Sequence, residues 1–389
     1  MTSEERREAR FKRRVAARNA KKRVALSSYD DFDKVFSFDN LYRAYQVSRR
    51  NVCWKASVQR YIINAPVNVL NTYYRLHQGK YRTPGFYEFD IHERGKLRHI
   101  RSTTIGERVV QRCLCDNALV PALTRTLVYD NGASMKYKGY DFAVRRITCH
   151  LQKHYRKHGN EGYILLFDFR KFFDNISHAL VKHIVNNELT DPRLRQIIHH
   201  FIDAFGDKGL GLGSQISQVL ALASANRLDH YIKERLRIKL YGRYNDDGYL
   251  IDVSKEKLKK CLDCIRKVCD YLKIELNEKK TQIVKLSHGF TWLKVRFFLT
   301  ESGKIIKRIN PRSITVQRRK LKKLHRKYLL GLIPFEGIRD SFLSWAAYSR
   351  KFSAYHTFVN MRELFESLFP KETRGTRWII SKSSVKMVA

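Results

Sequence analysis

Three aspartates have the residue type and spacing needed to hold divalent metal ions. Asp168 closes the short apolar run YILLFDF, and Asp246 and Asp247 sit at the turn of RYNDDGYLI. Carboxylates at the ends of neighbouring strands of one sheet can converge on a single point. At such a point they repel one another unless cations neutralise them. Hard oxygen ligands of this kind suit Mg²⁺.

The chemistry that such a cluster supports is phosphoryl transfer. Two Mg²⁺ ions about 3.5–4 Å apart clamp the attacking and leaving oxygens of an in-line displacement. The alternative for Asp246 and Asp247 is a plain hairpin turn, because Asp-Asp-Gly is a common turn sequence. Their combination with Asp168 and with a strongly basic chain favours the metal site. We therefore expect two Mg²⁺ ions, with Mn²⁺ as an alternative, at these three aspartates.

The elements around the aspartates follow a pattern that brings strand ends together. YILLFDF has the length and apolar composition of a strand, and KLYGRYNDDGYLIDV holds two strand-like halves around the acidic turn. SKEKLKKCLDCIRKVCDYLK has helical periodicity, and the strand-like TQIVKL and GFTWLKVRFFL follow. Two strand–helix units that share one sheet form the split β-α-β pattern, which predicts an α+β fold.

The charge of the whole chain indicates a polyanionic partner. Its 389 residues include 77 Lys and Arg against 37 Asp and Glu, a formal net charge of +40. Nucleic acid is the expected counter-charge, because contacts of Lys and Arg to phosphates release counterions. The basic residues run through the whole chain, which excludes a basic tail on a neutral domain. A content of 43% hydrophobic residues excludes disorder for most of the length.

The basic charge is densest in two segments. Residues 1–25 hold ten Lys or Arg against three Glu, and we expect a basic arm there. Residues 304–330 hold eleven Lys or Arg and no acid, and include the helical QRRKLKKLHRKYLL. An aromatic helical stretch follows, and the tail after Pro370 is expected to be poorly ordered.

Several other classes of site and location are disfavoured. Cys261, Cys264 and Cys269 invite a zinc site, but their segment is helical and lacks partner ligands nearby, so we expect a buried helix face. The odd total of seven cysteines suggests reduced thiols. The sequence contains no stretch of about 18 apolar residues, so we expect no membrane-spanning helix. The N-terminus lacks the apolar region of a signal peptide. We expect a cytoplasmic protein.

The order of motifs resembles that of prokaryotic reverse transcriptases of the group II intron-like class over roughly residues 90–370. The fingers blocks of that family are similar to GKLRHIRSTTIGERVVQRCL and NGASMKYKG. The palm motifs are similar to LLFDFRKFFDNISHALV, GLGLGSQISQVLALASANRLDHYIK and YNDD, and the later motifs to LNEKKTQIV and FTWLKVRFF. The resemblance implies a right-hand polymerase with fingers, a ferredoxin-like palm and a helical thumb. The expected segments are 1–39 for the arm, 40–160 for the fingers, 161–303 for the palm with a fingers-type insertion at about 179–212, 304–370 for the basic helical thumb, and 371–389 for the tail.

The resemblance also implies roles for individual residues. Asp168 and Asp246, with Asp247 beside them, become the catalytic metal ligands. Phe173 takes the place of an aromatic gate that excludes ribonucleotides, although simple core packing is its alternative and Phe172 is adjacent. Lys280 matches the lysine that protonates the leaving pyrophosphate, with Lys279 as its rival. The other implied contacts are Lys96, Arg98, Lys136, Lys138, Leu212 and Gly213 for the incoming nucleotide, and Trp292 and Leu293 for the primer grip.

The chain departs from the family pattern at the second palm motif, which points to a subgroup, and at Asn245. Leu212 replaces a glutamine and Gln218 a proline in the second palm motif. This form resembles diversity-generating retroelement enzymes and related defence-associated enzymes of the abortive-infection and unknown groups, and in the former it accompanies error-prone copying of adenines. Asn245 stands where the family more often has Met, Ala or Val, which predicts an altered contact with the primer end.

The motifs bear on four functions. An RNA-directed DNA polymerase that makes cDNA from a non-coding or element-encoded RNA is the first. A template-independent or protein-primed DNA polymerase of the abortive-infection type is the second. A non-catalytic RNA-binding scaffold is disfavoured by the intact aspartates, and an RNA-dependent RNA polymerase by Phe173 and the motif set. The expected partners are an RNA template, dNTPs and the cDNA product, with an accessory protein or a second copy as further candidates and no membrane.

Overall fold

The computed structural model describes residues 2–93, 96–380 and 385–388. Its buried apolar residues form three clusters: a large one between the N-terminal helices and one face of a central sheet, a second on the opposite face, and a third within the C-terminal helices. Helices and sheets occur together in this arrangement, as the predicted α+β class requires. Within the described residues no helix is long and apolar enough to cross a membrane.

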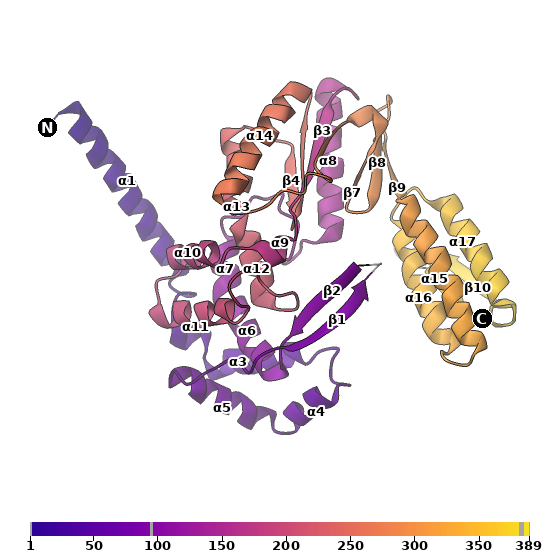
Figure 1. Ribbon diagram of the computed structural model, residues 1–389, viewed down its shortest axis with the longest axis horizontal. Coiled ribbons are helices and arrows are strands. Elements are labelled where there is room, and N and C mark those ends of the chain that lie inside the picture. The colour runs from indigo at the N-terminus through magenta and orange to yellow at the C-terminus, as the bar shows by residue number, and fades with distance from the viewer. Residues whose placement is uncertain (1, 94–95, 381–384, 389) are drawn as a thin grey trace.

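The first helix, α1 (Ser3–Leu26), projects from the body of the molecule (Figure 1). It begins at a capping box in which Thr2 and Glu5 satisfy each other's backbone N–H groups. The chain enters the main core at Leu26, and Phe32 and Phe36 are buried there. The expected arm of residues 1–39 therefore combines an exposed helix with a packed segment, because its last part carries apolar residues.

The rest of the N-terminal half consists of helices and one hairpin. The predicted strands around FYEFDIHERGKLRHIRS form the antiparallel pair β1 (Tyr87–Glu93) and β2 (Lys96–Ser102), whose connecting residues 94–95 lie outside the described chain. The helices are α2 (Phe32–Val35), α3 (Phe38–Ser48), α4 (Ala56–Ile63), α5 (Ala65–His77), α6 (Ile105–Leu114), the π-helix η1 (Cys115–Leu119), α7 (Val120–Thr124) and α8 (Tyr140–His158).

The central sheet has four antiparallel strands in the order β4-β5-β3-β6. Its strands are β3 (Tyr163–Asp168), β4 (Tyr241–Tyr244), β5 (Asp247–Asp252) and β6 (Gln282–Lys285), and α14 (Lys255–Tyr271) connects β5 to β6. With the helices between β3 and β4 counted as one crossover, this is the ferredoxin-like order. The strands and the helix expected from YILLFDF, the acidic hairpin, the cysteine-containing segment and TQIVKL are confirmed.

Both faces of the sheet are covered, which explains why β3 is apolar at every position before Asp168. Ile164 and Leu166 pack in the cluster that contains α8, whereas Leu165 and Phe167 pack in the cluster that contains α14. Successive side chains of a strand point to opposite faces, so a strand between two helical layers needs apolar residues throughout. Cys261 and Cys269 lie buried on α14 and form part of this packing.

Six short elements lie between β3 and β4 and carry the second palm-like motif. They are α9 (Phe172–Asn175), α10 (His178–Glu188), α11 (Pro192–Asp203), α12 (Gln215–Ser224), α13 (Asn226–His230) and the π-helix η2 (Tyr231–Arg235). Ser214 caps the N-terminus of α12 by accepting a hydrogen bond from the Ser217 backbone N–H. This cap starts α12 directly after the turn at Leu212 and Gly213.

A second, three-stranded sheet follows β6 and a short 3₁₀ turn, η3 (Leu286–His288). It contains β7 (Phe290–Trp292), β8 (Val295–Leu299) and β9 (Ile305–Ile309), in that order. β9 was expected to belong to the helical thumb that begins at residue 304. It pairs with β8 instead, because Ile305 and Ile309 continue the apolar face of this sheet.

The C-terminal helices form a separate body beside this sheet (Figure 1). They are α15 (Pro311–Leu329), α16 (Phe335–Arg350), α17 (Tyr355–Leu368) and α18 (Pro370–Thr373). The tail after Pro370, expected to be poorly ordered, instead includes the hairpin β10 (Arg377–Ile380) and β11 (Val385–Val388). Trp378 and Met387 of this hairpin pack against the buried core of the helices, which gives the tail an apolar anchor.

Candidate active site

The sheet brings the three predicted aspartates to one point. Asp168 and Asp247 are directly opposite each other in the pairing of β3 with β5, and Asp246 precedes Asp247 in the turn between β4 and β5. The Phe169 N–H donates a hydrogen bond to the Asp246 carbonyl oxygen at 3.1 Å. The predicted convergence of Asp168, Asp246 and Asp247 is therefore what the fold produces.

The residues beside the aspartates explain the local sequence. Asn245 has φ +52°, in the left-handed region, which asparagine tolerates better than the β-branched or bulky residues. A Cβ atom on Gly248 would lie 2.1 Å from the ring of Phe167, its partner on β3. The glycine of the Asp-Asp-Gly sequence is thus required by packing against the central strand.

The aspartate carboxylates are buried and repel one another, so a nearby positive charge stabilises their ionised form. Burial, together with repulsion from the charges of Asp246 and Asp168, raises the pKa of Asp247 to about 7. Burial likewise raises the pKa of Asp246, with Asp168 adding to the effect. A cation placed among these carboxylates lowers the cost of ionising them.

Two side chains from the segment after α14 hold Asp168. Asn277 Nδ2 donates to Asp168 Oδ1 at 3.0 Å, and Lys280 Nζ donates to Asp168 Oδ2 at 2.6 Å. Burial lowers the pKa of Lys280, but the hydrogen bond to Asp168 and the charges of the aspartates outweigh burial and raise it. Of the two candidate lysines, it is Lys280 that contacts the cluster.

The donor set fits a magnesium ion that completes its coordination with substrate. In the described part of the chain, no three or more His, Cys, Asp or Glu side chains are already grouped as ligands of one metal. Mg²⁺ in nucleotide-handling sites is typically held by one or two carboxylates, by water and by substrate phosphates, without a closed protein cage. Asp168, Asp246 and Asp247 supply oxygen ligands of this type.

A cleft of about 1000 Å³ opens above the aspartates. Several cations line it, so that negative and positive groups face one space. Among the residues predicted from the sequence, the cleft is lined by Arg98, Asp168, Asp246, Asp247, Lys280, Trp292 and Leu293. Arg98 comes from β2, and its charge acts to lower the pKa of Asp246.

The turn between β7 and β8 enters the cleft in an unusual conformation. Trp292 pairs with Val295, so the turn consists of Leu293 and Lys294, and both have positive φ, +47° and +65°. Such two-residue turns normally contain Gly, which has no Cβ, or Asn, which tolerates the left-handed region, whereas most other side chains are strained there. Trp292 is buried against the Tyr249 ring at 4.8 Å, which holds the turn in place.

The remaining predicted nucleotide contacts lie outside the residues that line this cleft. Lys138 donates to the carbonyl oxygens of Tyr129 and Asn131 at 2.8 and 3.1 Å, and Lys136 lies over the ring of Tyr137. Burial lowers the pKa of Lys138. The Lys96 side chain lies outside what the structure describes.

The two adjacent phenylalanines after Asp168 have different surroundings. Phe172 is buried in the main core, whereas Phe173 is partly exposed and packs against the outside of that core. The Phe173 carbonyl oxygen accepts a hydrogen bond from the Leu210 N–H at 2.7 Å. Phe173 is thus the ring with a free side, and it is tied to the start of the second palm-like motif.

Leu212 and Gly213 lie against the hairpin that carries Arg98. The Arg101 N–H donates to the Leu212 carbonyl oxygen at 3.1 Å. Gly213 has φ +111°, and a Cβ there would lie 2.9 Å from the Arg101 carbonyl oxygen. The close approach of these two backbones requires glycine at this position.

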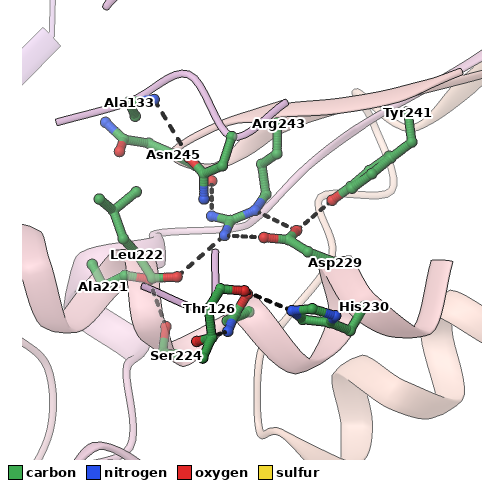
Figure 2. Close-up of polar contacts among 12 residues, drawn as sticks. Thr126, Ala133, Ala221, Leu222, Ser224, Asp229, His230, Tyr241, Arg243 and Asn245 are labelled. Carbon is green, nitrogen blue, oxygen red and sulfur yellow. Dashed lines mark hydrogen bonds and ion pairs between the residues drawn. The ribbon is translucent and has the colours of Figure 1, made fainter. Parts of the chain in front are cut away.

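Sequence reasoning missed a buried ion pair beneath the acidic turn. Arg243 and Asp229 are both 0% exposed, and the guanidinium also donates to the carbonyl oxygen of Asn245 at 2.8 Å (Figure 2). A signal was present, because an arginine two residues before the turn interrupts an otherwise apolar strand. Asn277, which orients Asp168, was also missed.

Comparison with known proteins agrees with this site. The family model described as reverse transcriptase (RNA-dependent DNA polymerase) matches residues 91–297, more than half of the chain, and contains all three aspartates. No curated protein sequence matches the chain.

Similar solved structures include three telomerases. Apo telomerase from Candida tropicalis truncated from its C-terminal domain is 14% identical, with a TM-score of 0.44 over 62% of this chain and 60% of that chain. Apo telomerase from Candida tropicalis is 13% identical, with a TM-score of 0.45 over 58% of this chain and 49% of that chain. Telomerase from Candida albicans in complex with a fragment of telomeric RNA is 10% identical, with a TM-score of 0.46 over 77% of this chain and 61% of that chain. The chain thus spans about half to three fifths of the telomerase chains it matches. On the strength of the family match, the chain belongs to the reverse transcriptase family.

Proposed function

We propose that this protein is an RNA-directed DNA polymerase that makes cDNA by two-metal nucleotidyl transfer. The observation that carries the proposal is the meeting of Asp168, Asp246 and Asp247 at one edge of a cleft, inside the region that matches the family. The raised pKa values of Asp246 and Asp247 support a cluster that needs divalent cations. In the proposal, the N-terminal helices with the β1–β2 hairpin correspond to the fingers, the central sheet to the palm and the C-terminal helices to the thumb.

Asp168, Asp246 and Asp247 hold the metal ions in this proposal. Bound Mg²⁺ supplies activation of the primer 3′-hydroxyl and neutralisation of the leaving pyrophosphate. Asn277 keeps Asp168 oriented through its hydrogen bond to Oδ1. Lys280 carries the proton that the pyrophosphate takes up as it leaves, and its contact with Asp168 keeps it at the cleft.

The other residues of the cleft bind the nucleotide and the primer. Arg98 offers a fixed guanidinium to the triphosphate, since it lines the same cleft as the aspartates. Leu293, at the strained turn that enters the cleft, contacts the primer end, supported by Trp292. Phe173 and Leu212 lie outside the residues that line the cleft; in the proposal Phe173 selects deoxynucleotides with its exposed side, and Leu212 contacts the incoming base.

The polymerase assignment is tested by isosteric removal of single carboxylates. Asp246→Asn and Asp247→Asn should fold normally and lose primer extension on an RNA template with dNTPs and Mg²⁺. Loss of several kcal/mol of metal stabilisation corresponds to a rate decrease of about a thousandfold or more. Asp252→Asn, at the other end of β5, is the matched control and should retain activity. Full activity of both Asp246→Asn and Asp247→Asn would contradict the polymerase assignment.

The biological role that we propose is phage defence or sequence diversification in a prokaryotic cell. It is motivated by Leu212 and Gln218 in the second palm motif, where the chain resembles defence-associated and diversity-generating enzymes. The template in the proposal is a dedicated or element-encoded RNA, and the enzyme acts in the cytoplasm, alone, as a homo-oligomer or with an accessory protein. Neighbouring genes separate the two roles: a repeated template and variable region indicates diversification, and a structured RNA gene without such repeats indicates defence.

A further inference from the structure

A buried guanidinium lies directly beneath the acidic turn. Arg243, on β4, is fully buried, although arginine is among the residues that are rarely buried unless paired. Figure 2 shows its side chain between Asp229, Leu222 and Asn245. These partners come from α13, α12 and the turn itself, so one side chain joins three segments.

The contacts of Arg243 are those of a fixed fork. Its Nε and Nη2 donate to the two carboxylate oxygens of Asp229 at 2.8 and 2.7 Å, and Nη2 also donates to the Leu222 carbonyl oxygen at 3.2 Å. Nη1 is left for the Asn245 carbonyl oxygen at 2.8 Å. Tyr241 Oη donates to Asp229 Oδ1 at 2.5 Å, which fixes the carboxylate from the other side.

The backbone of Arg243 is held as firmly as its side chain. β4 is an edge strand of the sheet, and its outer edge is covered by residues 130–132. The Arg243 N–H donates to the Asp130 carbonyl oxygen at 3.2 Å, and the Gly132 N–H donates to the Arg243 carbonyl oxygen at 2.9 Å. The guanidinium is therefore a rigid reference point for the turn.

The hydrogen bond from Arg243 acts on the peptide that carries Asp246. The Asn245 carbonyl belongs to the peptide plane that ends at the Asp246 nitrogen, and Asn245 is in the left-handed region with φ +52°. The next carbonyl, that of Asp246, accepts from the Phe169 N–H at 3.1 Å. Both peptides of the turn are thus clamped, one by Arg243 and one by the Phe169 N–H that directly follows β3, which sets the direction of the Asp246 side chain.

We propose that Arg243 and Asp229 are positioning residues that hold the Asn245–Asp246 peptide so that Asp246 and Asp247 can bind metal together. The inference rests on the proposed polymerase function. A purely stabilising role explains the arrangement less well, because the desolvation of a buried ion pair offsets most of its attraction, and apolar pairs of similar volume often stabilise a fold as much. An apolar pair would leave the Asn245 carbonyl without its donor.

The test replaces both charges at once. Arg243→Met combined with Asp229→Leu leaves no unpaired buried charge, so the protein should fold with a thermal midpoint near that of the wild type. We expect kcat for single-nucleotide addition to fall at least tenfold, with less than threefold change in KM for dNTP and in the Kd for template–primer. Half-saturation by Mg²⁺ should shift at least fivefold upward. The same readouts on Arg193→Met combined with Asp33→Leu, a bidentate pair that joins α11 to α2 outside the central sheet, should stay within twofold of wild type.

Arg243→Lys provides a second variant if the double variant does not fold. Lysine keeps the charge opposite Asp229 but cannot span Asp229 and the Asn245 carbonyl together, so kcat should again fall while folding is kept. A folded variant of either kind with wild-type kcat and Mg²⁺ dependence would overturn the inference.

Mn²⁺ binding, measured by electron paramagnetic resonance without substrate, separates this inference from the proposed function. Weaker Mn²⁺ binding in the double variant supports the positioning role of Arg243 and Asp229. If the wild type also extends no primer, only the polymerase proposal fails. If a folded double variant binds Mn²⁺ as tightly as the wild type, and the wild type extends primers, the positioning inference fails while the polymerase proposal stands.

Discussion

Lys280 Nζ lies 2.6 Å from Asp168 Oδ2, at the point where the three aspartates meet. The ammonium group thereby places a positive charge next to a cluster whose carboxylates repel one another. A metal ion that takes Asp168 as a ligand competes with this contact. Release of Lys280 toward the cleft would then accompany metal binding, which suits a residue proposed to protonate pyrophosphate.

Removal of this lysine should therefore affect chemistry more than binding. Lys280→Ala is expected to lower kcat by about 10²–10⁴-fold, the range typical of general acid catalysis. Lys279→Ala, which alters the neighbouring lysine of the same cleft, should cause a clearly smaller loss. Single-turnover nucleotide addition measures both, and equal losses in the two variants would show that Lys280 has no special role.

Phe173 should control the choice of sugar. Phe173→Val removes the ring that is proposed to clash with a 2′-hydroxyl, so ribonucleotide incorporation should rise relative to deoxynucleotide incorporation. Relief of a clash of about 1–3 kcal/mol corresponds to about a 5-fold to 150-fold change. Phe172→Val is the control: this ring is buried in the core, so stability should fall without a change in selectivity. If discrimination is the same in Phe173→Val as in the wild type, Phe173 is a packing residue.

Leu212 should lower the fidelity of copying. A glutamine would offer an amide that donates and accepts hydrogen bonds near the base, whereas leucine offers apolar contact alone. One net hydrogen bond is worth about 0.5–1.5 kcal/mol, so Leu212→Gln should reduce errors at template adenines about two- to tenfold. Sequencing of cDNA made on a defined RNA template measures the change. An unaltered error spectrum would mark Leu212 as a lineage difference without a role in fidelity.

The basic face of α15 should contact nucleic-acid phosphates. Arg319 and Lys322 line a hollow beside α17, in a segment of the chain without acidic residues. Arg319→Glu and Lys322→Glu should each weaken template–primer binding and reduce the slope of log K against log salt by about 1. Lys260→Glu, on α14, makes the same charge change elsewhere and should leave the slope near that of the wild type. Identical slopes for all three variants would place the nucleic acid away from α15.

Buried Glu107 should make stability depend on pH. Burial raises its pKa to about 7, against which the hydrogen bond from Gln111 acts only in part. The folded state therefore holds this proton more tightly than the unfolded state. The contribution of Glu107 to the free energy of unfolding is complete below about pH 4.5 and is lost as the pH rises toward 7. Glu107→Gln should remove this decline and raise stability at pH 8 by up to about 3 kcal/mol. Urea unfolding at pH 5 and pH 8 measures it, and parallel pH profiles for both proteins would contradict the assignment.

The composition and local patterns of the sequence were sufficient for the central architecture. The apolar run before Asp168, the two halves around Asn245 and the helical period of residues 255–271 each depend on local propensity and on which faces are buried, and the strands and the helix appeared where these patterns predicted them. The meeting of Asp168 with Asp247 followed because strand ends in one small sheet are adjacent. Family membership followed from the order of the motifs.

Tertiary structure decided what depends on partners distant in sequence. Only packing shows that Phe167 occupies the space of a Cβ on Gly248, that Lys280 and not Lys279 reaches Asp168, and that Arg243 closes on Asp229 beneath the turn. The strands β9, β10 and β11 were not predicted for the same reason, since short apolar segments become strands only when another strand or core accepts them. Charge and periodicity describe each segment alone, whereas a buried ion pair and a shared sheet edge exist only after the segments have come together.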